Sequence, residues 1–259
     1  MVKFKLLEMM DLEQFYQKGY FIIENVLKDD YILSLKLKLD EIQKKQEEDF
    51  GVDKLELIGE KNMVRCPFVY DYNFLSLIDN PLILKVCEEI LGSYFILSLQ
   101  NAIIIPPNQS HHQSFYHRDI IHQDFTSSSP LGVNVYYCLD DYTPENGGTI
   151  FLEGSHLLPI LPKIKNEVCP KIKKGSVILF DSMLYHKAGV NSTNNYRYGI
   201  NHMFTLPFIK QQFNFPSLIP NDFSYSPSLE RILGYKTQEF TSVNAFRNYR
   251  LKKIKNEMA

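Results

Sequence analysis

Two side chains able to bind a metal lie two positions apart in the segment Phe115-Tyr-His-Arg-Asp119. Side chains alternate in direction along an extended segment, so His117 and Asp119 point the same way and can bind one ion. A histidine much farther along the chain, His186, can complete a set of two imidazoles and one carboxylate. Such a set holds Fe(II) and leaves coordination positions open for a co-substrate and O2. The chemistry that these residues predict is oxidation.

The His-x-Asp spacing alone is a weak signal, because the chain contains 7 histidines and 30 acidic residues. The same spacing recurs a few positions on, as His122 and Asp124. His156, which follows a Gly-Ser turn, is another potential ligand, although a histidine there more often satisfies local backbone groups. From the residues alone, both His-x-Asp pairs stay open as metal ligands.

A longer series of motifs narrows the choice. It begins with the first His-x-Asp segment (115–119), an Asp-Asp-Tyr-Thr-Pro-Glu-Asn-Gly-Gly stretch (140–148) and a Glu-Gly-Ser-His turn (153–156). An apolar run that leads to a histidine (175–186) and a segment that begins with Arg-Tyr-Gly (197–212) complete it. This ordered series resembles the phytanoyl-CoA dioxygenase family of Fe(II)- and 2-oxoglutarate-dependent oxygenases. The resemblance extends from Leu12 to Gln212.

The resemblance implies roles for individual residues. His117, Asp119 and His186 would be the catalytic metal ligands, which leaves the pair at 122 and 124 in a loop. Arg197 would bind the distal carboxylate of 2-oxoglutarate, the co-substrate. The implied reaction consumes O2, hydroxylates the substrate, and releases succinate and CO2. Related halogenases carry a small residue in place of the carboxylate, so Asp119 points to oxygenation, with epimerisation, desaturation and ring closure as alternative outcomes.

Composition argues against several other classes of protein. Of the 259 residues, 44% are hydrophobic, which is ample for one core. A net charge of −2 gives no electrostatic reason to bind nucleic acid or an anionic membrane. No segment is long and apolar enough to span a bilayer. The four cysteines form no CxxC pattern, so neither disulfides nor a zinc site is predicted, and a reducing cytoplasm fits.

We therefore predict a single domain over 1–259, with a helical part to residue 93, a β core over 94–212 and a C-terminal extension. The expected partner is a small-molecule substrate, and the expected state is a monomer or a weak homodimer. The N-terminal part should place the apolar stripe Ile32, Leu35, Leu39 and Ile42 of one long helix against the core. Its predicted elements are a helix over 11–18 capped by Asp11, a strand over 20–24, a helix over 29–48, and helices over 75–78 and 81–91. The stretch 49–66 is predicted as a loop, with a short strand left open, and 51–65 is a candidate lid.

From Tyr94 to Leu206, short β-rich runs alternate with turn residues, a pattern typical of a barrel or a double-sheet roll. Within the strands over 94–105 and 131–139, polar side chains share one face. These faces either line a ligand cavity or meet solvent, and the pattern favours neither. The candidate co-substrate contacts in the first case are Gln100, Asn134, Tyr136 and Thr149. The run 176–180 should be a buried strand.

A turn-rich stretch around residue 193 predicts a hairpin between strands over 184–190 and 196–206. That hairpin would place Arg197 about 10 Å along the strand from His186. An arginine inside a barrel needs an anionic partner, because an unpaired buried charge is costly. A surface position for Arg197 is the alternative.

These patterns together predict a mainly β protein with flanking helices, an α+β fold. Its core would be a double-stranded β-helix of the jelly-roll or cupin-like type, with the N-terminal helices packed on one sheet. His202 has the opposite strand parity to Arg197 and should be a structural residue away from the metal. No motif identifies the substrate, although a pocket bordered by Phe115, Tyr116, Phe125 and Tyr136 would suit a partly apolar metabolite.

Two other classes of function stay open at this stage. One is a non-catalytic β-helix protein that binds a small ligand. The other is a cupin-type metal enzyme without redox chemistry, such as an isomerase or epimerase that uses zinc or manganese. The C-terminal stretch should form a short helix over 228–234 and a basic, solvated end over 247–255.

Overall fold

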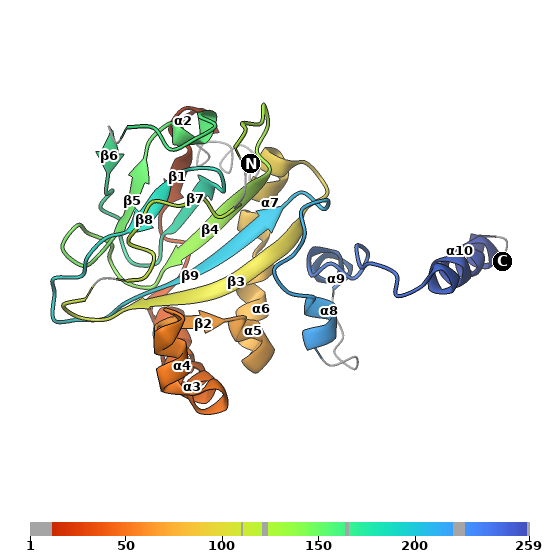
Figure 1. Ribbon diagram of the computed structural model, residues 1–259, viewed down its shortest axis with the longest axis horizontal. Helices are drawn as coiled ribbons and strands as arrows, with labels where there is room; N and C mark the ends of the chain where they lie inside the picture. The colour runs from red at the N-terminus through yellow and green to blue at the C-terminus, as the bar shows by residue number, and fades with distance from the viewer. Residues whose placement is uncertain (1–11, 110, 121–123, 164–165, 220–225, 258–259) are drawn as a thin grey trace. The chain divides into compact units, whose positions relative to one another are not determined.

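The computed structural model describes residues 12–109, 111–120, 124–163, 166–219 and 226–257. The chain divides into two compact units, the first ending at Phe213 and the second beginning at Asn214. The first unit contains both sheets and the helices that precede them (Figure 1). Asp11, the predicted cap of the first helix, lies outside the described residues.

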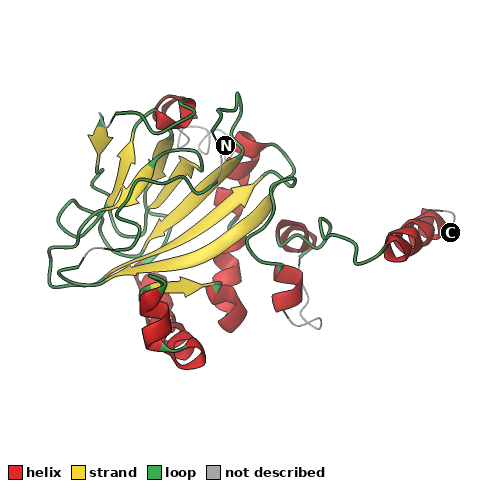
Figure 2. Ribbon diagram, viewed as in Figure 1, coloured by secondary structure: helices red, strands yellow, loops and turns green. Residues whose placement is uncertain are grey.

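The strands of the first unit form two antiparallel sheets, which Figure 2 shows in yellow. The larger sheet has the order β1-β7-β4-β9-β3-β2, and the smaller has the order β6-β5-β8. The predicted strand over 176–180 is confirmed as β7, whose residues are all buried. The strands are β1 Tyr20–Ile23, β2 Met63–Arg65, β3 Ile96–Ile105, β4 Gly132–Cys138, β5 Thr149–Leu152, β6 Glu167–Val168, β7 Val177–Asp181, β8 His186–Ala188 and β9 Arg197–Thr205.

Four helices of the first unit, α2, α3, α6 and α7, match the predicted ones. The long helix α3 buries Ile32, Leu35, Leu39 and Ile42, which is the predicted stripe. The side chain of Asn80 caps α7 by accepting hydrogen bonds from the backbone N–H groups of Leu82 and Ile83. The helical elements are α2 Leu12–Lys18, α3 Asp29–Phe50, α4 Val52–Leu57, α5 Pro67–Tyr70, η1 Tyr72–Phe74, α6 Leu75–Ile78, α7 Pro81–Leu91 and η2 Ser155–Leu157.

Helices cover one face of the larger sheet, and a cavity lies on the other. The hydroxyl of Tyr137 on β4 donates to the carbonyl of Leu77, which precedes the end of α6. Tyr136, the next residue back, points the opposite way, as strand alternation requires. It shares a cavity with Thr149 and His186 of the smaller sheet. The cavity therefore lies between the two sheets.

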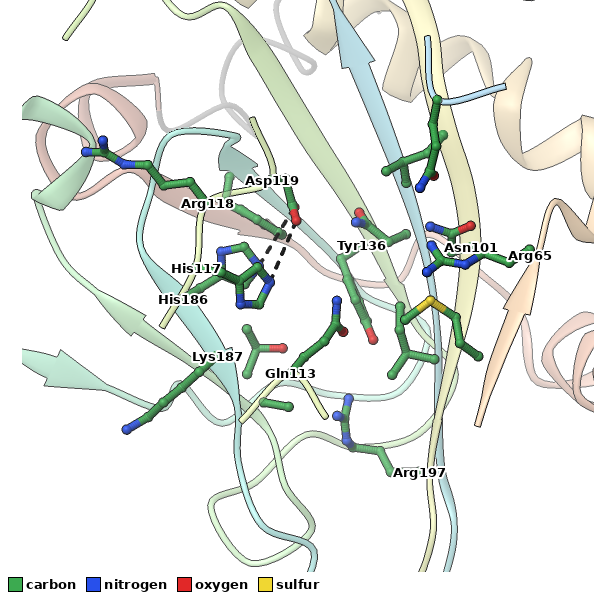
Figure 3. A pocket seen from close by; sticks show the side chains of 18 residues that line it. Arg65, Asn101, Gln113, His117, Arg118, Asp119, Tyr136, His186, Lys187 and Arg197 are labelled. Atoms are coloured by element: carbon green, nitrogen blue, oxygen red, sulfur yellow. Dashed lines mark ion pairs between the residues drawn. The ribbon is translucent and has the colours of Figure 1, made fainter. Parts of the chain in front are cut away.

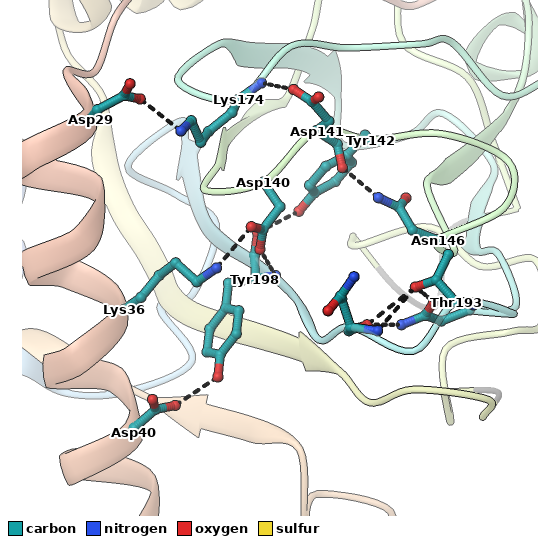
Figure 4. A network of polar contacts seen from close by, with 12 residues as sticks. Asp29, Lys36, Asp40, Asp140, Asp141, Tyr142, Asn146, Lys174, Thr193 and Tyr198 are labelled. Carbon is teal, nitrogen blue, oxygen red and sulfur yellow. Dashed lines mark hydrogen bonds and ion pairs between the residues drawn. The ribbon is translucent and has the colours of Figure 1, made fainter.

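Polar contacts fix α3 to the start of β9 (Figure 4). Lys36 Nζ forms an ion pair of 2.8 Å with Asp140, and the hydroxyl of Tyr198 donates to Asp40 at 2.8 Å. Asp140 also accepts a hydrogen bond from the backbone N–H of Tyr198 at 2.8 Å. These contacts anchor the residue that follows Arg197.

The segment 49–66 contains the short strand that the sequence left open, and also a helix that was not predicted. Gly51, with φ of 101°, ends α3, and α4 begins at the next residue. The strand β2 then pairs with β3, with Met63 opposite Ile103. Both elements are short, so their patterns in the sequence are weak. The backbone hydrogen bonds to β3 fix β2 at the edge of the larger sheet. Residues 63–65 therefore cannot move as a lid, and this part of the prediction is wrong.

The predicted hairpin is also wrong. The strand β8 pairs with β5 in the smaller sheet, whereas β9 pairs with β3 and β4 in the larger one. The connection between them crosses from one sheet to the other. Asn191 fixes this crossing, because its amide donates to the carbonyls of Ile105 and Asn195. Turn residues located the reversal, but they do not indicate which sheet each arm joins.

The second unit contains the helices α8 Phe215–Leu218, α9 Pro227–Ile232 and α10 Val243–Glu257. The hydroxyl of Ser226 caps α9 by accepting from the backbone N–H of Leu229, so the predicted short helix is confirmed with slightly different bounds. The basic end is part of the longer helix α10. Within the described ranges, none of the helices combines the length and apolarity that crossing a membrane requires.

Candidate metal centre and its cavity

The side chains of His117, Asp119 and His186 converge at one place in the cavity (Figure 3). An isolated antiparallel bridge joins their two segments: the backbone N–H of each histidine donates to the carbonyl of the other, at 3.0 and 3.1 Å. One ligand atom from each side chain lies within 4.8 Å of the other two. The Nε2 atoms of the two histidines each lie 3.8 Å from an oxygen of the Asp119 carboxylate.

Backbone carbonyls orient both imidazole rings. Nδ1 of His117 lies 3.0 Å from the carbonyl oxygen of Phe115, and Nδ1 of His186 lies 3.0 Å from that of Leu184. Because a carbonyl can only accept, each Nδ1 carries the proton, and each Nε2 presents a lone pair. Burial lowers the pKa of His186 to about 4, so this imidazole is neutral near pH 7.

The donor set fits a bound metal ion. His117 Nε2 and Asp119 Oδ2 are buried and have no hydrogen-bond partner. Buried polar atoms are nearly always paired, so two unpaired acceptors that face each other suit a shared cation. Two imidazole nitrogens and one carboxylate are the ligands of non-haem Fe(II) centres. In the described ranges, no other cluster of three such side chains has this spacing.

Arg118 lies between the two ligands and holds their segment in place. Its buried guanidinium donates to the carbonyls of Met183 at 2.8 Å, Ser155 at 3.0 Å and Pro159 at 3.0 Å, and it also contacts that of Leu158. The backbone N–H of Asp119 donates to the carbonyl of Ser182 at 3.1 Å. The side chain of one residue thus ties the first ligand segment to the loop that leads to His186.

Arg197 is 2% exposed, and its Nε and Nη1 have no hydrogen-bond partner. No carboxylate in the described part of the chain forms an ion pair with it. The guanidinium carbon lies 4.0 Å from the centre of the Tyr142 ring, a cation–π contact that fixes its position. A buried arginine with two unpaired donors indicates a site for an anion.

The cavity has a volume of about 270 Å3 and is lined by both sheets. It includes the metal ligands, Arg197, and two of the predicted co-substrate contacts, Tyr136 and Thr149. Figure 3 shows Tyr136 between the metal ligands and the far wall of the cavity. The six residues that the sequence analysis assigned to one site therefore line one cavity.

Two predicted contacts, Gln100 and Asn134, do not line the cavity. Gln100 faces the helices, where it accepts from the backbone N–H of Phe68 and donates to the carbonyl of Phe74. The cavity face of β3 consists instead of the alternating residues 99, 101 and 103. Asn134 has the same strand parity as Tyr136, but its side chain is fully buried and accepts a hydrogen bond of 3.1 Å from Asn201.

The remaining candidates lie away from the cavity. His202 packs on the helix side, 2.7 Å from the Gln100 amide, which agrees with the predicted structural role. His156 Nε2 lies 3.2 Å from the carbonyl of Tyr16. Phe115, at 81% exposure, Tyr116 and Phe125 are not among the cavity-lining side chains described, so the predicted aromatic border is wrong except for Tyr136. His122 lies outside the described residues.

The sequence analysis did not single out several polar residues that line the cavity, although two of them belong to the stretches 51–65 and 111–114 that we expect to contact the substrate: Arg65, Asn101, Gln113, Arg118, Lys187, Asn201 and Gln212. A signal for Asn201 was present, because it has the same strand parity as Arg197. Arg65 and Asn101 were hidden for another reason. The segment that carries Arg65 was predicted as a loop with only an uncertain short strand, and the polar Gln100 drew attention to the wrong face of β3.

The fold and the donor set together define a class of protein. Two antiparallel sheets that enclose two histidines and one carboxylate are typical of mononuclear non-haem oxygenases. Residues 15–199 match the family model described as phytanoyl-CoA dioxygenase (PhyH). The chain therefore belongs to the phytanoyl-CoA dioxygenase family and is an oxidoreductase of the oxygenase type.

Several known proteins are similar to this chain. Uncharacterized protein Rv1501 of Mycobacterium tuberculosis is 30% identical over 204 residues, which cover 76% of this chain and 75% of that protein. Dioxygenase trt7 of Aspergillus terreus is 23% identical over 241 residues, which cover 86% of this chain and 82% of trt7.

Solved structures of low sequence identity share the fold. The non-heme monooxygenase ThoJ, in its apo form, aligns with a TM-score of 0.60 at 16% identity, over 78% of this chain and 79% of that one. EvdMO1 aligns with a TM-score of 0.62 at 21% identity, over 78% of this chain. This chain spans only 50% of the EvdMO1 chain.

Proposed function

We propose that the protein is an Fe(II)- and 2-oxoglutarate-dependent dioxygenase. It hydroxylates a small-molecule metabolite or biosynthetic intermediate and releases succinate and CO2, and its two sheets form a double-stranded β-helix of the jelly-roll type. One observation carries the proposal. Three metal-ligand side chains and a buried arginine with unpaired donors line the same cavity.

His117, Asp119 and His186 would hold the iron, which when bound supplies the activation of O2. The carbonyls of Phe115 and Leu184 keep the two rings in one orientation, so both Nε2 atoms face the carboxylate. Positions fixed by backbone hydrogen bonds need no rearrangement when the ion enters. The protein thus contributes a preformed donor set between two sheets.

Arg197 would bind the far carboxylate of 2-oxoglutarate. This co-substrate can chelate a metal through its 1-carboxylate and 2-keto oxygen, while its 5-carboxylate extends away. A guanidinium presents its N–H donors in a planar fork that matches the oxygens of a carboxylate, and Nε and Nη1 are the donors of Arg197 that have no partner. Burial strengthens this pairing, because water does not screen it.

The test is optical and does not require the substrate. Anaerobic addition of Fe(II) and 2-oxoglutarate should produce a visible metal-to-ligand charge-transfer band, which His117→Ala, Asp119→Ala or His186→Ala should abolish. Arg197→Ala should raise the 2-oxoglutarate concentration for half-maximal absorbance about tenfold or more, as expected for a lost charge-assisted hydrogen bond. Fe(II) affinity without 2-oxoglutarate should not change in that variant.

Lys187→Met is the matched control, because Lys187 also lines the cavity but is paired with Glu167. It should leave the band unchanged. A band that survives in His117→Ala but disappears in His122→Ala would assign the metal to the neighbouring His-x-Asp pair. Tight binding of zinc or manganese without any band would instead favour a metal enzyme of the non-redox type.

A further inference from the structure

Four neighbouring strands of the larger sheet place one polar side chain each in a row across the cavity. Arg65 on β2 lies opposite Asn101 on β3, Asn101 lies opposite Asn201 on β9, and Asn201 lies opposite Tyr136 on β4. All four side chains line the cavity. We call these four residues the polar row. In Figure 3, Arg65 and Asn101 lie across Tyr136 from the metal ligands.

Asn201 and the residues beyond it in the polar row lie apart from the anion site at Arg197, whereas Tyr136 adjoins both. Arg197 and Asn201 lie on the same face of β9, four positions apart, which corresponds to about 13 Å along a strand. Gly199 lies between them. A Cβ atom at Gly199 would come within 2.1 Å of the Tyr142 hydroxyl and 2.3 Å of the Tyr136 ring. The two rings therefore occupy the space above Gly199, between Arg197 and Asn201.

The charge of the polar row is already balanced. Arg65 Nε donates to Glu60 at 3.1 Å, and Nη2 contacts the other carboxylate oxygen. Nη1 donates to the amide oxygen of Asn101 at 2.8 Å, while the Asn101 amide nitrogen donates to the carbonyl of Gln100. A guanidinium engaged in this way has little to offer a second carboxylate. Arg197 differs in this respect, because its Nε and Nη1 have no hydrogen-bond partner.

Asn201 provides the one unsatisfied acceptor among the described atoms of this row. The residue is 8% exposed, and its Nδ2 donates to Asn134 Oδ1 at 3.1 Å. Asn134 in turn donates to the hydroxyl of Ser182 at 3.0 Å, so the orientation of both amides is fixed. Asn201 Oδ1 is buried and has no partner. A buried acceptor without a donor carries a desolvation penalty, which a ligand donor would remove.

We infer that the polar row is the substrate-recognition site and that Asn201 Oδ1 accepts a hydrogen bond from a hydroxyl or amide N–H of an uncharged substrate. The inference rests on the proposed function only in naming this ligand the substrate. Apolar side chains of β2 and β3 border the row on both sides, at Met63, Leu99 and Ile103. They suit a substrate that is partly apolar. Polyanionic substrates, such as coenzyme A thioesters, do not fit the polar row, because its one positive charge, on Arg65, is already paired with Glu60.

The experiment compares small probes of similar size by ligand-observed NMR. The protein is loaded with Zn2+, which supports no turnover, and saturated with 2-oxoglutarate so that Arg197 is engaged. The probes are cyclohexanol, cyclohexanecarboxamide and cyclohexanecarboxylate. The alcohol and the amide should bind in competition with each other, and the carboxylate should bind at least tenfold more weakly. Asn201→Leu should weaken the alcohol about tenfold, as expected for an unmade buried hydrogen bond.

Met203→Leu is the matched control, because Met203 follows Asn201 on the same face of β9 and contributes no hydrogen bond to the row. It should bind cyclohexanol like the wild type. If Asn201→Leu fails to fold, the nearly isosteric Asn201→Asp replaces it, and the added charge should shift the preference from cyclohexanol to cyclohexylammonium. The 2-oxoglutarate affinity should be the same in every variant.

Three results would overturn the inference: equal affinity of cyclohexanol for wild type and Asn201→Leu, tighter binding of the carboxylate, or no saturable binding of the alcohol. None of them depends on iron chemistry. A protein that selects the alcohol through Asn201 but gives no charge-transfer band would refute the proposed function alone. A protein that gives the band but prefers the carboxylate would refute the recognition site alone.

Discussion

The buried carboxyl group of Asp181 makes stability depend on pH. Burial raises its pKa from an ordinary value near 3.8 to about 6, despite a hydrogen bond of 2.7 Å from the backbone N–H of Met183. The folded state therefore holds this proton more tightly than the unfolded chain. Its stabilising contribution is complete below pH 4 and is lost as pH rises through 6.

Asp181→Asn should remove this dependence, because the amide keeps an acceptor for Met183 and carries no charge. We expect a gain of up to about 3 kcal/mol in the free energy of unfolding at pH 7, from a shift of roughly two pKa units. Urea denaturation between pH 4.5 and 7.5 measures it. Burial lowers the pKa of His202 to about 3, so this residue makes stability rise with pH, opposite to Asp181. The quantity to compare is therefore the difference in the free energy of unfolding between variant and wild type at each pH. A constant difference across this range would contradict the prediction.

Individual residues were predictable where type and spacing suffice. The spacing of the metal ligands and the ordered series of motifs marked those three residues, and a charge inside a predicted strand marked Arg197. Nothing in the sequence distinguished Asn201, because an asparagine in a strand is equally compatible with a position that faces solvent. Gln100 shows the reverse error: its polar side chain suggested a cavity, but helix backbone groups satisfy it.

At the scale of elements, Arg118 links the segment of the first two ligands to the turn and loop around it. It binds carbonyls from the 155–159 turn and from Met183, and its guanidinium lies 4.1 Å from the Tyr185 ring centre. Arg118→Met should lower the affinity for Fe(II) or Co(II) by 10- to 100-fold, roughly the effect of losing a group that orients a ligand. Chelator competition provides the measurement.

Arg118→Lys provides the control, because an ammonium can reach only part of this set of carbonyls and should give an intermediate loss. The Co(II) absorption spectrum should also change in the methionine variant, since the angle between the ligand segments is no longer fixed. If metal affinity and spectrum stay the same while the melting temperature falls, Arg118 supports packing alone.

Helices and sheet membership differ in how far the sequence predicts them. The apolar stripe on α3 and the bounds of α7 depend on local patterns, and both predictions were confirmed. The partners of β8 and β9 depend on contacts between distant segments, which a turn at residue 193 does not encode. The strand β3 also contains a register shift between Leu97 and Leu99, and a shift of one residue exchanges the two faces.

At the scale of the whole molecule, the second unit ends in a helix that contributes little to stability by itself. The described side chains of α10 are exposed or half-buried, and its basic residues give it a polar surface. Phe240 packs on Phe246 and Tyr249, with ring centres 5.2 and 5.3 Å apart, so these contacts stay within the tail. An isolated helix of 15 residues is marginal in water.

We therefore expect that truncation after Ser242 shifts the melting temperature by less than about 2 °C, because removing exposed surface changes the free energy of unfolding little. The charge-transfer band should be unchanged, since the metal ligands and Arg197 belong to the first unit. Amide hydrogens of α10 should exchange quickly in the intact protein, in contrast to those of α3, which buries a stripe of four residues. Sedimentation of both forms completes the test: loss of a dimer on truncation would assign α10 to subunit contact, and a large drop in melting temperature would show that it packs against the fold.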